Sequence, residues 1–145
     1  MLRTLLLAST FAAAAAAQCA TLAVTGTGAP GTALTISIDG TTANAIAFVA
    51  IGDTQGSTSI PLGPLGTLDL GLAMPFVPVP VGMTNASGDA SLTINVPTGF
   101  VGGVDVFGQG ITIGFNIPSG PPGPGFPNNL FSLCTTNVVG FHVGT

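Results

Sequence analysis

The sequence has 145 residues, of which 46% are hydrophobic and 4% are charged, and its formal net charge is −4. Ordinary soluble proteins carry roughly 25% charged residues, so the surface of this protein must consist mainly of hydroxyl, amide and small side chains. Arg3 is the only Lys or Arg, which leaves nucleic-acid binding and attraction to anionic lipids without the clustered Lys and Arg that they need. The high hydrophobic content excludes intrinsic disorder.

Residues 1–17 predict a secretory signal peptide. Arg3 supplies a positive start, an apolar stretch follows, and Ala15 with Ala17 forms an A-x-A cleavage pattern. The apolar stretch is shorter than the roughly 20 residues that a membrane-spanning helix needs, and no second stretch of this kind follows. We therefore expect a secreted, extracellular or surface-associated chain with no transmembrane segment and one domain over residues 18–145.

Cys19 directly follows the expected cleavage site, where a bacterial lipoprotein would carry its lipid. Lipid attachment needs a small residue before the cysteine and usually a leucine three residues before it, but these positions hold Gln18 and Ala16. The only other cysteine is Cys134, and a secreted domain with two cysteines usually links them. Alternation places both cysteines at a surface or sheet rim. The sequence therefore predicts a Cys19–Cys134 disulfide and no lipid anchor.

Short alternating runs separated by turn residues predict an all-β fold, a single antiparallel β-sandwich of about seven to eight strands that is Ig-like or jelly-roll-like. Residues 21–25, 33–39 and 91–96 each place apolar side chains on one face and mostly polar ones on the other, which is typical of half-buried strands. Residues 45–51, AIAFVAI, are apolar at every position. They form either a central strand covered on both sides or a strand with an exposed apolar strip.

Three proline-rich stretches, residues 61–66, 75–80 and 117–127, are predicted to be loops or sheet edges because proline cannot donate to a central ladder. The third stretch contains GPPGPG, which is too short for a collagen helix, so we expect a stiff Pro/Gly-rich surface loop.

Two further strands are expected in the last third of the chain. Residues 103–115 alternate in two halves around Gly108 and Gly110, which predicts a bulge or a corner between sheets. The alternation near the end of the chain places the terminal strand in a sheet. Four phenylalanines fit core positions, namely Phe48, Phe115, Phe131 and Phe141. The pattern does not assign four others to the core, namely Phe76, Phe100, Phe107 and Phe126. An exposed cluster among these four would be a binding patch.

The titratable residues do not suggest a catalytic set. His142 is the only histidine and is expected on the outward face of the last strand, and no G-x-S-x-G motif is present to supply a nucleophile. Three aspartates adjoin glycines in predicted turns, namely Asp39, Asp53 and Asp89. The other two, Asp69 and Asp105, are expected to face solvent from strands. We therefore predict that the protein is not an enzyme and has no catalytic residue and no cofactor.

The stretch NASGD places oxygen-bearing side chains at alternate positions, namely Asn85, Ser87 and Asp89. Calcium prefers such ligands, but no full binding-loop pattern follows, so these residues are weak candidates and no metal site is predicted. The stretch also begins with an N-x-S pattern, a glycosylation acceptor in eukaryotic secretion. The Trp and Tyr that usually contact flat sugar faces are absent, and no ligand-binding residue can be assigned.

The chain runs from TLAVTGTGAPGTALTISIDG through AIAFVAIGDT, LDLGL and MTNASGDASLTINVP to GVDVFGQGITIGF. With Φ for an apolar residue, its G-x-A-Φ-Φ-Φ-Φ-G strand, D-x-x-G-x-Φ turn and late Φ-x-Φ-x-x-Q strand occur in an order that resembles an uncharacterised β-sandwich module. Such modules lie at the ends of secreted proteins of planctomycete-like bacteria. The resemblance covers most of residues 20–115, and Gln109 matches the late glutamine. It implies a secreted sandwich and assigns no activity.

Two function classes remain. The first is a structural or assembly component of the cell surface or extracellular matrix. Edge strands are normally protected by lysine or inward charges, and this chain has no lysine, so we expect homotypic association through strand edges that proline and loops leave open. The second is a monomeric extracellular binding module for a glycan, a protein or calcium.

Overall fold

The computed structural model describes residues 18–115 and 130–145. The predicted signal peptide and the predicted loop at 117–127 lie outside the described residues. The described chain is all-β, with one short 3-10 turn, Gly63–Leu65, and nine strands. The strands are β1 (Thr21–Thr25), β2 (Ala33–Asp39), β3 (Ile46–Gly52), β4 (Gln55–Pro61), β5 (Thr67–Leu72), β6 (Phe76–Met83), β7 (Ala90–Asn95), β8 (Val104–Phe115) and β9 (Phe131–Val143).

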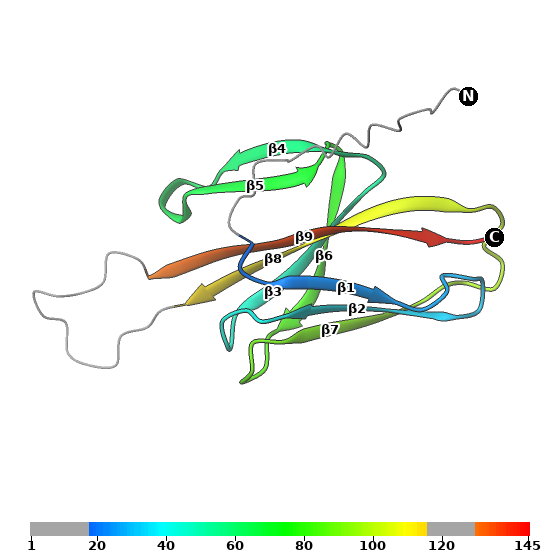
Figure 1. Ribbon diagram of the computed structural model, residues 1–145, viewed down its shortest axis with the longest axis horizontal. Helices are drawn as coiled ribbons and strands as arrows, with labels where there is room; N and C mark the ends of the chain where they lie inside the picture. Colours follow the sequence, from blue (N-terminus) through cyan, green and yellow to red (C-terminus); the bar gives the residue numbers. More distant parts are fainter. Residues whose placement is uncertain (1–17, 116–129) are drawn as a thin grey trace, which may run out of the picture.

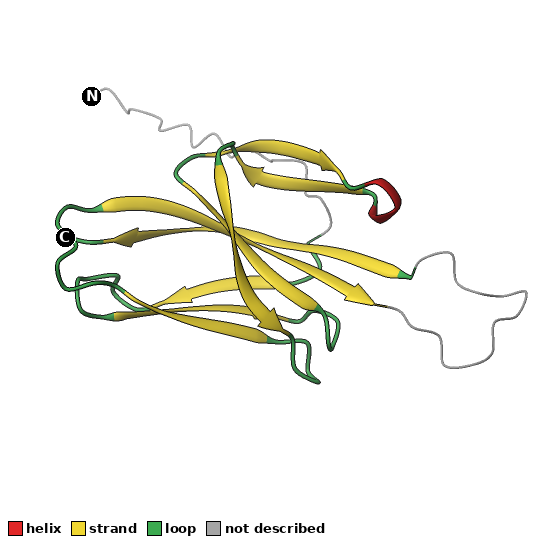
Figure 2. Cartoon of the chain, turned by 180° about the vertical axis from the view of Figure 1, so that it is seen from behind, coloured by secondary structure: helices red, strands yellow, loops and turns green. Residues whose placement is uncertain are grey.

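These strands form three layers (Figures 1 and 2). A three-stranded sheet in the order β1-β2-β7 faces a four-stranded sheet in the order β6-β3-β8-β9, and the β4–β5 hairpin covers the other face of the four-stranded sheet. Neighbouring strands within each sheet are antiparallel. The predicted antiparallel β-sandwich is confirmed, with nine strands rather than seven to eight. The additional hairpin layer was not predicted.

The strand order is that of an Ig-like sandwich. In that architecture one sheet has the order A-B-E-D, and the other is built on G-F-C, to which variable-type domains add C′. Here β1, β2 and β7 occupy positions A, B and E, whereas β6, β3, β8 and β9 occupy C′, C, F and G. No described strand occupies position D, so β7 is an edge strand.

Two hydrophobic clusters explain why residues 45–51 are apolar at every position. The first core cluster lies between the two larger sheets and consists of Leu22, Ile36, Ile38, Ala47 and Val49. The second core cluster lies under the hairpin and consists of Ala50, Leu68, Leu70, Leu72 and Ile111, with Phe48 packed against it. Strand β3 therefore contributes alternate residues to both clusters. It is central and covered on both sides, the first of the two interpretations of its sequence.

An irregularity lies at the predicted place, but its extra residue belongs to β9: between Gln109 and Ile111, Gly110 of β8 stands opposite both Thr136 and Asn137. The Gly110 N–H donates to the Thr136 Oγ1 (2.7 Å). A Cβ atom at Gly110 would lie 2.7 Å from the Cγ2 of Thr136, which is 1% exposed. The bulge thus depends on the missing side chain as well as on the hydrogen bond.

We expect Gly110→Ala to lower the free energy of unfolding by about 2 kcal/mol, because Thr136 cannot move away without disturbing the core. Gly108→Ala is the matched control on the same strand. Its Cβ would meet Phe141, Leu22 and Val49 at ordinary contact distances of 3.4 to 3.5 Å. The control should change the unfolding free energy by less than about 1 kcal/mol. Urea denaturation followed by circular dichroism measures both, and equal losses would contradict the proposed clash.

The prediction that Phe115 and Phe131 lie in the core is wrong. Their rings are 42% and 44% exposed and pack edge-to-face on each other, with centroids 5.6 Å apart. They are register partners at one end of the β8–β9 ladder. This end of the ladder runs past the three-stranded sheet (Figure 1). By contrast, Phe76 and Phe107 are partly buried against the second core cluster. Phe126 lies outside the described residues.

Candidate functional site

A disulfide between Cys19 and Cys134 closes one side of the sandwich, as the sequence predicted. The two Cα atoms lie 5.7 Å apart, at a sequence separation of 115. Next to it, the Cys19 N–H donates to the carbonyl oxygen of Thr135 (3.3 Å), and Ala20 forms a parallel bridge with Thr136. The start of the fold is therefore held against its last strand.

The Asn137 side chain continues this closure. The Leu22 N–H donates to Asn137 Oδ1 (2.8 Å), and Asn137 Nδ2 donates to the Leu22 carbonyl oxygen (3.2 Å). One primary amide thus satisfies the outward-facing donor and acceptor of a β1 residue, as a neighbouring strand would. The edge of β1 is therefore closed at Leu22, next to the bridge between Ala20 and Thr136.

The four-stranded sheet has β9 at one edge and β6 at the other, and β6 carries Pro78 and Pro80. These residues pair with Ala50 and Phe48 of β3. They are two positions apart, so their nitrogens point to the same side of the strand, and proline is tolerated in a sheet where that side faces outward. The prediction that residues 75–80 form a loop or a sheet edge is therefore confirmed, and the edge lacks donors for another strand at Pro78 and Pro80.

The edge of β7 has no comparable protection. Residues 90–95, ASLTIN, contain no proline and no charged residue, and the strand pairs only with β2. Among the described residues, no backbone hydrogen bond joins β7 to a strand on its other side. Its outer face presents Ser91, Thr93 and Asn95, which are exposed. The strand therefore offers its backbone groups and a polar, uncharged face to any strand that aligns with it.

A second feature is a carboxylate within hydrogen-bond distance of the single histidine. His142 and Asp105 are register partners on β9 and β8, and Asp105 Oδ1 lies 2.7 Å from His142 Nδ1. Both side chains are solvent-accessible, 49% for His142 and 81% for Asp105. The imidazole also lies so close to Gly103 that a Cβ there would overlap its Nε2. The ring is thus held between Gly103 and the carboxylate.

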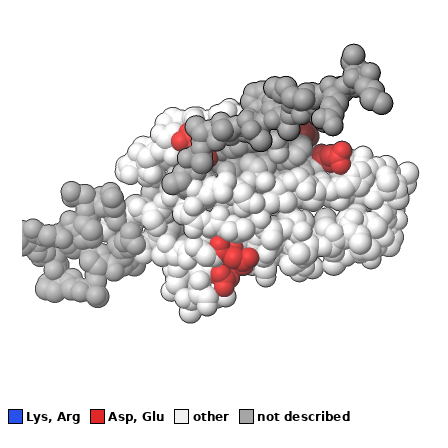
Figure 3. All heavy atoms as spheres, in the orientation of Figure 1, with Lys and Arg blue, Asp and Glu red and all other residues white. Residues whose placement is uncertain are grey.

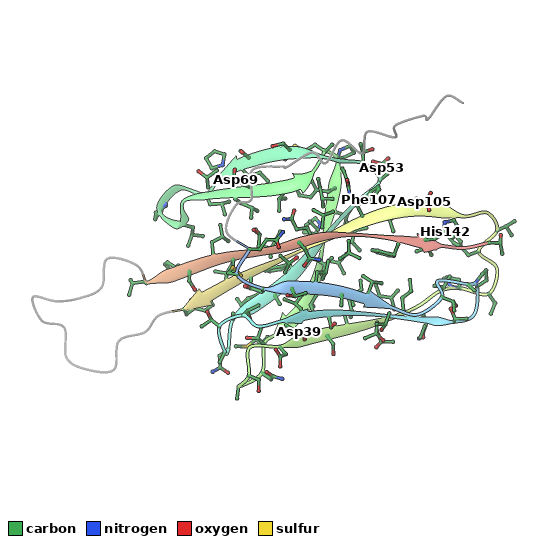
Figure 4. The ribbon with its side chains drawn as sticks, viewed as in Figure 1. Asp39, Asp53, Asp69, Asp105, Phe107 and His142 are labelled. Carbon is green, nitrogen blue, oxygen red and sulfur yellow. A yellow bond between two sulfur atoms is a disulfide. The ribbon has the colours of Figure 1, made fainter. Side chains whose placement is uncertain are left out.

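This pair borders a hollow of about 290 Å³, which we call the β8–β9 hollow. Its lining residues are Asp105, Val106, Phe107, Gly140, Phe141 and His142. Phe107 and Gly140 are register partners, and a Cβ at Gly140 would lie 3.0 Å from the Phe107 Cε1. The Phe107 ring therefore lies across the β9 backbone. Alternation puts Asp105 and Phe107 on the same side of β8. Figure 4 places them near His142 and well apart from Asp39 and Asp69.

The other predicted site residues do not converge. Asp39, Asp53, Asp69 and Asp105 are exposed, and Figure 3 shows the acidic side chains as small separate patches on a largely uncharged surface. His142 and Asp105 face solvent as predicted, but their pairing was not predicted. No group of three or more His, Cys, Asp or Glu residues in the described part of the chain is placed to hold a metal ion.

The weak calcium candidates form a turn before β7. Asn85 Oδ1 accepts the N–H groups of Ser87 (2.8 Å) and Asp89 (3.0 Å). Asp89 Oδ1 accepts the Gly40 N–H (3.1 Å). These oxygens bind backbone donors, the usual arrangement of an Asx turn. Asn85 itself is exposed.

Comparisons of the chain with protein-family models, with curated proteins and with solved structures find no match. The resemblance to planctomycete-like secreted modules therefore stays a prediction. The described residues also contain no helix of the length and apolarity needed to cross a membrane.

Gln109, which had no predicted role, connects the three strands β5, β8 and β9 beside the second core cluster. It is 6% exposed. Its Oε1 accepts the Gly71 N–H of β5 (2.8 Å), and its Nε2 donates to the Thr136 carbonyl oxygen of β9 (2.9 Å). A single amide from β8 thus links the hairpin layer to the four-stranded sheet. Alternation alone could not identify it, because a polar residue in a strand is normally assigned to the outer face.

Proposed function

We propose that the protein is a secreted, non-enzymatic structural or assembly component of the cell surface or extracellular matrix, and that its copies associate through β7. The observation that carries this proposal is the unprotected β7 edge. The three other edges of the larger sheets differ from it, since β1 and β9 meet at Ala20, Leu22 and Asn137, and β6 carries Pro78 and Pro80.

The empty position beside β7 suits a strand from a second copy. In the Ig-like order, position D lies next to E and is antiparallel to it. If β7 of a second copy occupies this position, a twofold axis relates the two strands, and each supplies the same residues to the contact. The two three-stranded sheets then form one continuous six-stranded sheet. This is strand addition, in which main-chain hydrogen bonds supply the affinity.

The charge distribution supports the same mode of association. A β7–β7 contact buries no charged side chain of residues 90–95, so the desolvation cost is limited to hydroxyl and amide groups. The five aspartates past the predicted cleavage site all lie outside residues 90–95, so the repulsion between negatively charged copies is not concentrated at the contact. Salt screens this repulsion, so association should strengthen as the salt concentration rises.

Lysine substitutions on β7 should weaken association at least tenfold. Ser91→Lys/Thr93→Lys places two positive charges on each edge strand, so that four like charges meet across the twofold contact. The matched control is Ser37→Lys/Thr35→Lys. These positions are the register partners of Ser91 and Thr93 on the central strand β2, so the control adds the same charge to the same face away from the edge.

Sedimentation equilibrium of the secreted protein, with negative-stain imaging, measures the outcome. We expect concentration-dependent association for the wild type and the β2 variant, and a monomer for the β7 variant. A wild-type protein that stays monomeric at every concentration and forms no fibres or sheets would contradict the proposal. Equal loss of association in both lysine variants would show that charge rather than edge pairing is responsible.

A second candidate function, a monomeric extracellular binding module, is favoured by the β8–β9 hollow. The hollow combines an aromatic ring, an exposed carboxylate and an imidazole, whereas strand-edge association uses none of these groups. A ligand that binds only the folded protein would raise its melting temperature.

A further inference from the structure

We propose that the β8–β9 hollow binds one neutral sugar ring of an extracellular glycan. The hollow lies on the face of β8 and β9 that carries the second core cluster, and Phe107 packs against that cluster. Further along the same face, Asp105 and His142 are solvent-accessible. The hollow therefore has an apolar inner end and a polar outer end, the combination found in small-molecule sites.

The inner end offers a surface for the C–H groups of a sugar ring. Phe107 is partly exposed and lines the hollow, while Gly140, which has no side chain, lets the ring lie directly against the β9 backbone. Apolar contact with an aromatic face is the contribution that Trp or Tyr would otherwise make in this chain. Phe107 belongs to the group of phenylalanines whose exposure the sequence left open.

The outer end offers hydrogen bonds to hydroxyl groups. Asp105 Oδ1 is engaged by His142 Nδ1 (2.7 Å), and no described residue donates to its second oxygen, Oδ2. A carboxylate oxygen accepts hydroxyl donors in charge-assisted hydrogen bonds, which are stronger than neutral ones. Contacts of His142 with Gly103 and Asp105 fix the imidazole, so little side-chain freedom is lost when a ligand binds.

The charges of the chain restrict the ligand to a neutral one. No Lys or Arg follows Arg3, and the one basic side chain in the hollow, His142, is already engaged by Asp105, so the hollow has no free basic group to pair with a carboxylate, sulfate or phosphate group. An acidic sugar would instead meet Asp105. A simple cation is also disfavoured, because His142 already binds the carboxylate. A neutral polyhydroxylated ring satisfies both the aromatic and the polar part of the hollow.

Titration of the ¹⁵N-labelled secreted protein with neutral trisaccharides, followed by amide chemical shifts, tests the proposal. Suitable probes are cellotriose, maltotriose, xylotriose and N,N′,N″-triacetylchitotriose. We expect at least one of them to produce saturable shifts confined to residues 103–107 and 140–143, with a Kd on the order of 1 mM, as for a small exposed site. Shifts that are absent for all four, or that are spread over the surface, would overturn the proposal.

Asp105→Asn should weaken binding about tenfold, because the charge-assisted hydrogen bonds become neutral ones. Asp69→Asn is the matched control, since Asp69 is another exposed strand aspartate that binds a neighbouring side chain, Ser59, and it lies outside the hollow. Its affinity should equal that of the wild type. Equal effects of the two variants, or tighter binding of trigalacturonate than of any neutral probe, would contradict the assignment. Because sedimentation measures association at β7 separately, failure of one proposal leaves the other standing.

Discussion

Reduction of the Cys19–Cys134 disulfide is expected to lower the free energy of unfolding by about 5 kcal/mol. The bond joins residues 115 positions apart. In the unfolded chain it closes a loop of this length, and the entropy removed from the unfolded state corresponds to about 5 kcal/mol at 25 °C. Small proteins are stable by only about 5–15 kcal/mol, so the reduced protein should be close to unfolding at physiological temperature.

Denaturant titrations with and without a phosphine reductant measure this effect, followed by circular dichroism because the chain lacks Trp and Tyr. A gain in intact mass of about 2 Da verifies reduction. Cys19→Ala/Cys134→Ala is the control, since it should be as unstable as the reduced protein and should not respond to the reductant. A loss below about 1 kcal/mol would contradict the expected effect of the covalent link on the entropy of the unfolded chain.

The strands that were predicted well are those that pack against another layer with only one of their two faces. Residues 21–25 and 33–39 coincide with β1 and β2, because one face of each is buried and the other is in water. Alternation reports this difference directly. The same reasoning made residues 45–51 ambiguous, and only the β4–β5 hairpin on the second face of β3 decides between the two interpretations.

The hairpin layer could not be predicted because its position depends on long-range packing. LDLGL alternates, and Leu68, Leu70 and Leu72 are buried, but nothing local indicates which sheet they cover. Phe115 and Phe131 were misplaced for a related reason, since alternation shows which face a residue is on but not how far the opposing layer extends. Their end of β8 and β9 runs past the three-stranded sheet (Figure 1).

The candidate site was predicted only in part. Alternation predicted that His142 and Asp105 are exposed. Their pairing depends on the register between β8 and β9, which shifts by one residue at the bulge opposite Gly110. A register change of one residue moves every side chain to the other face, so the pairing follows only from the complete ladder. The Cys19–Cys134 disulfide needed no register, because two cysteines in one chain have only one intramolecular pairing.

Gln109→Leu is expected to lower the free energy of unfolding by about 3 kcal/mol, although leucine fills a similar volume. The change leaves the Gly71 N–H and the Thr136 carbonyl oxygen without their partner, and unsatisfied buried groups of this kind cost about 1–3 kcal/mol each. Urea denaturation followed by circular dichroism measures the loss. Gln55→Leu on β4 is the matched control, because Gln55 is exposed and should tolerate the change with a loss below about 0.5 kcal/mol.

Gln109→Glu separates the two hydrogen bonds. An ionised carboxylate still accepts from Gly71 but cannot donate to the Thr136 oxygen, and its charge is buried, so the variant should be at least as unstable as Gln109→Leu at neutral pH. Protonation restores the donor and removes the charge, so the stability of this variant should rise relative to the wild type as the pH is lowered. If instead both variants were as stable as Gln55→Leu, the hairpin layer would be held by the leucines of the second core cluster alone, without the Gln109 amide.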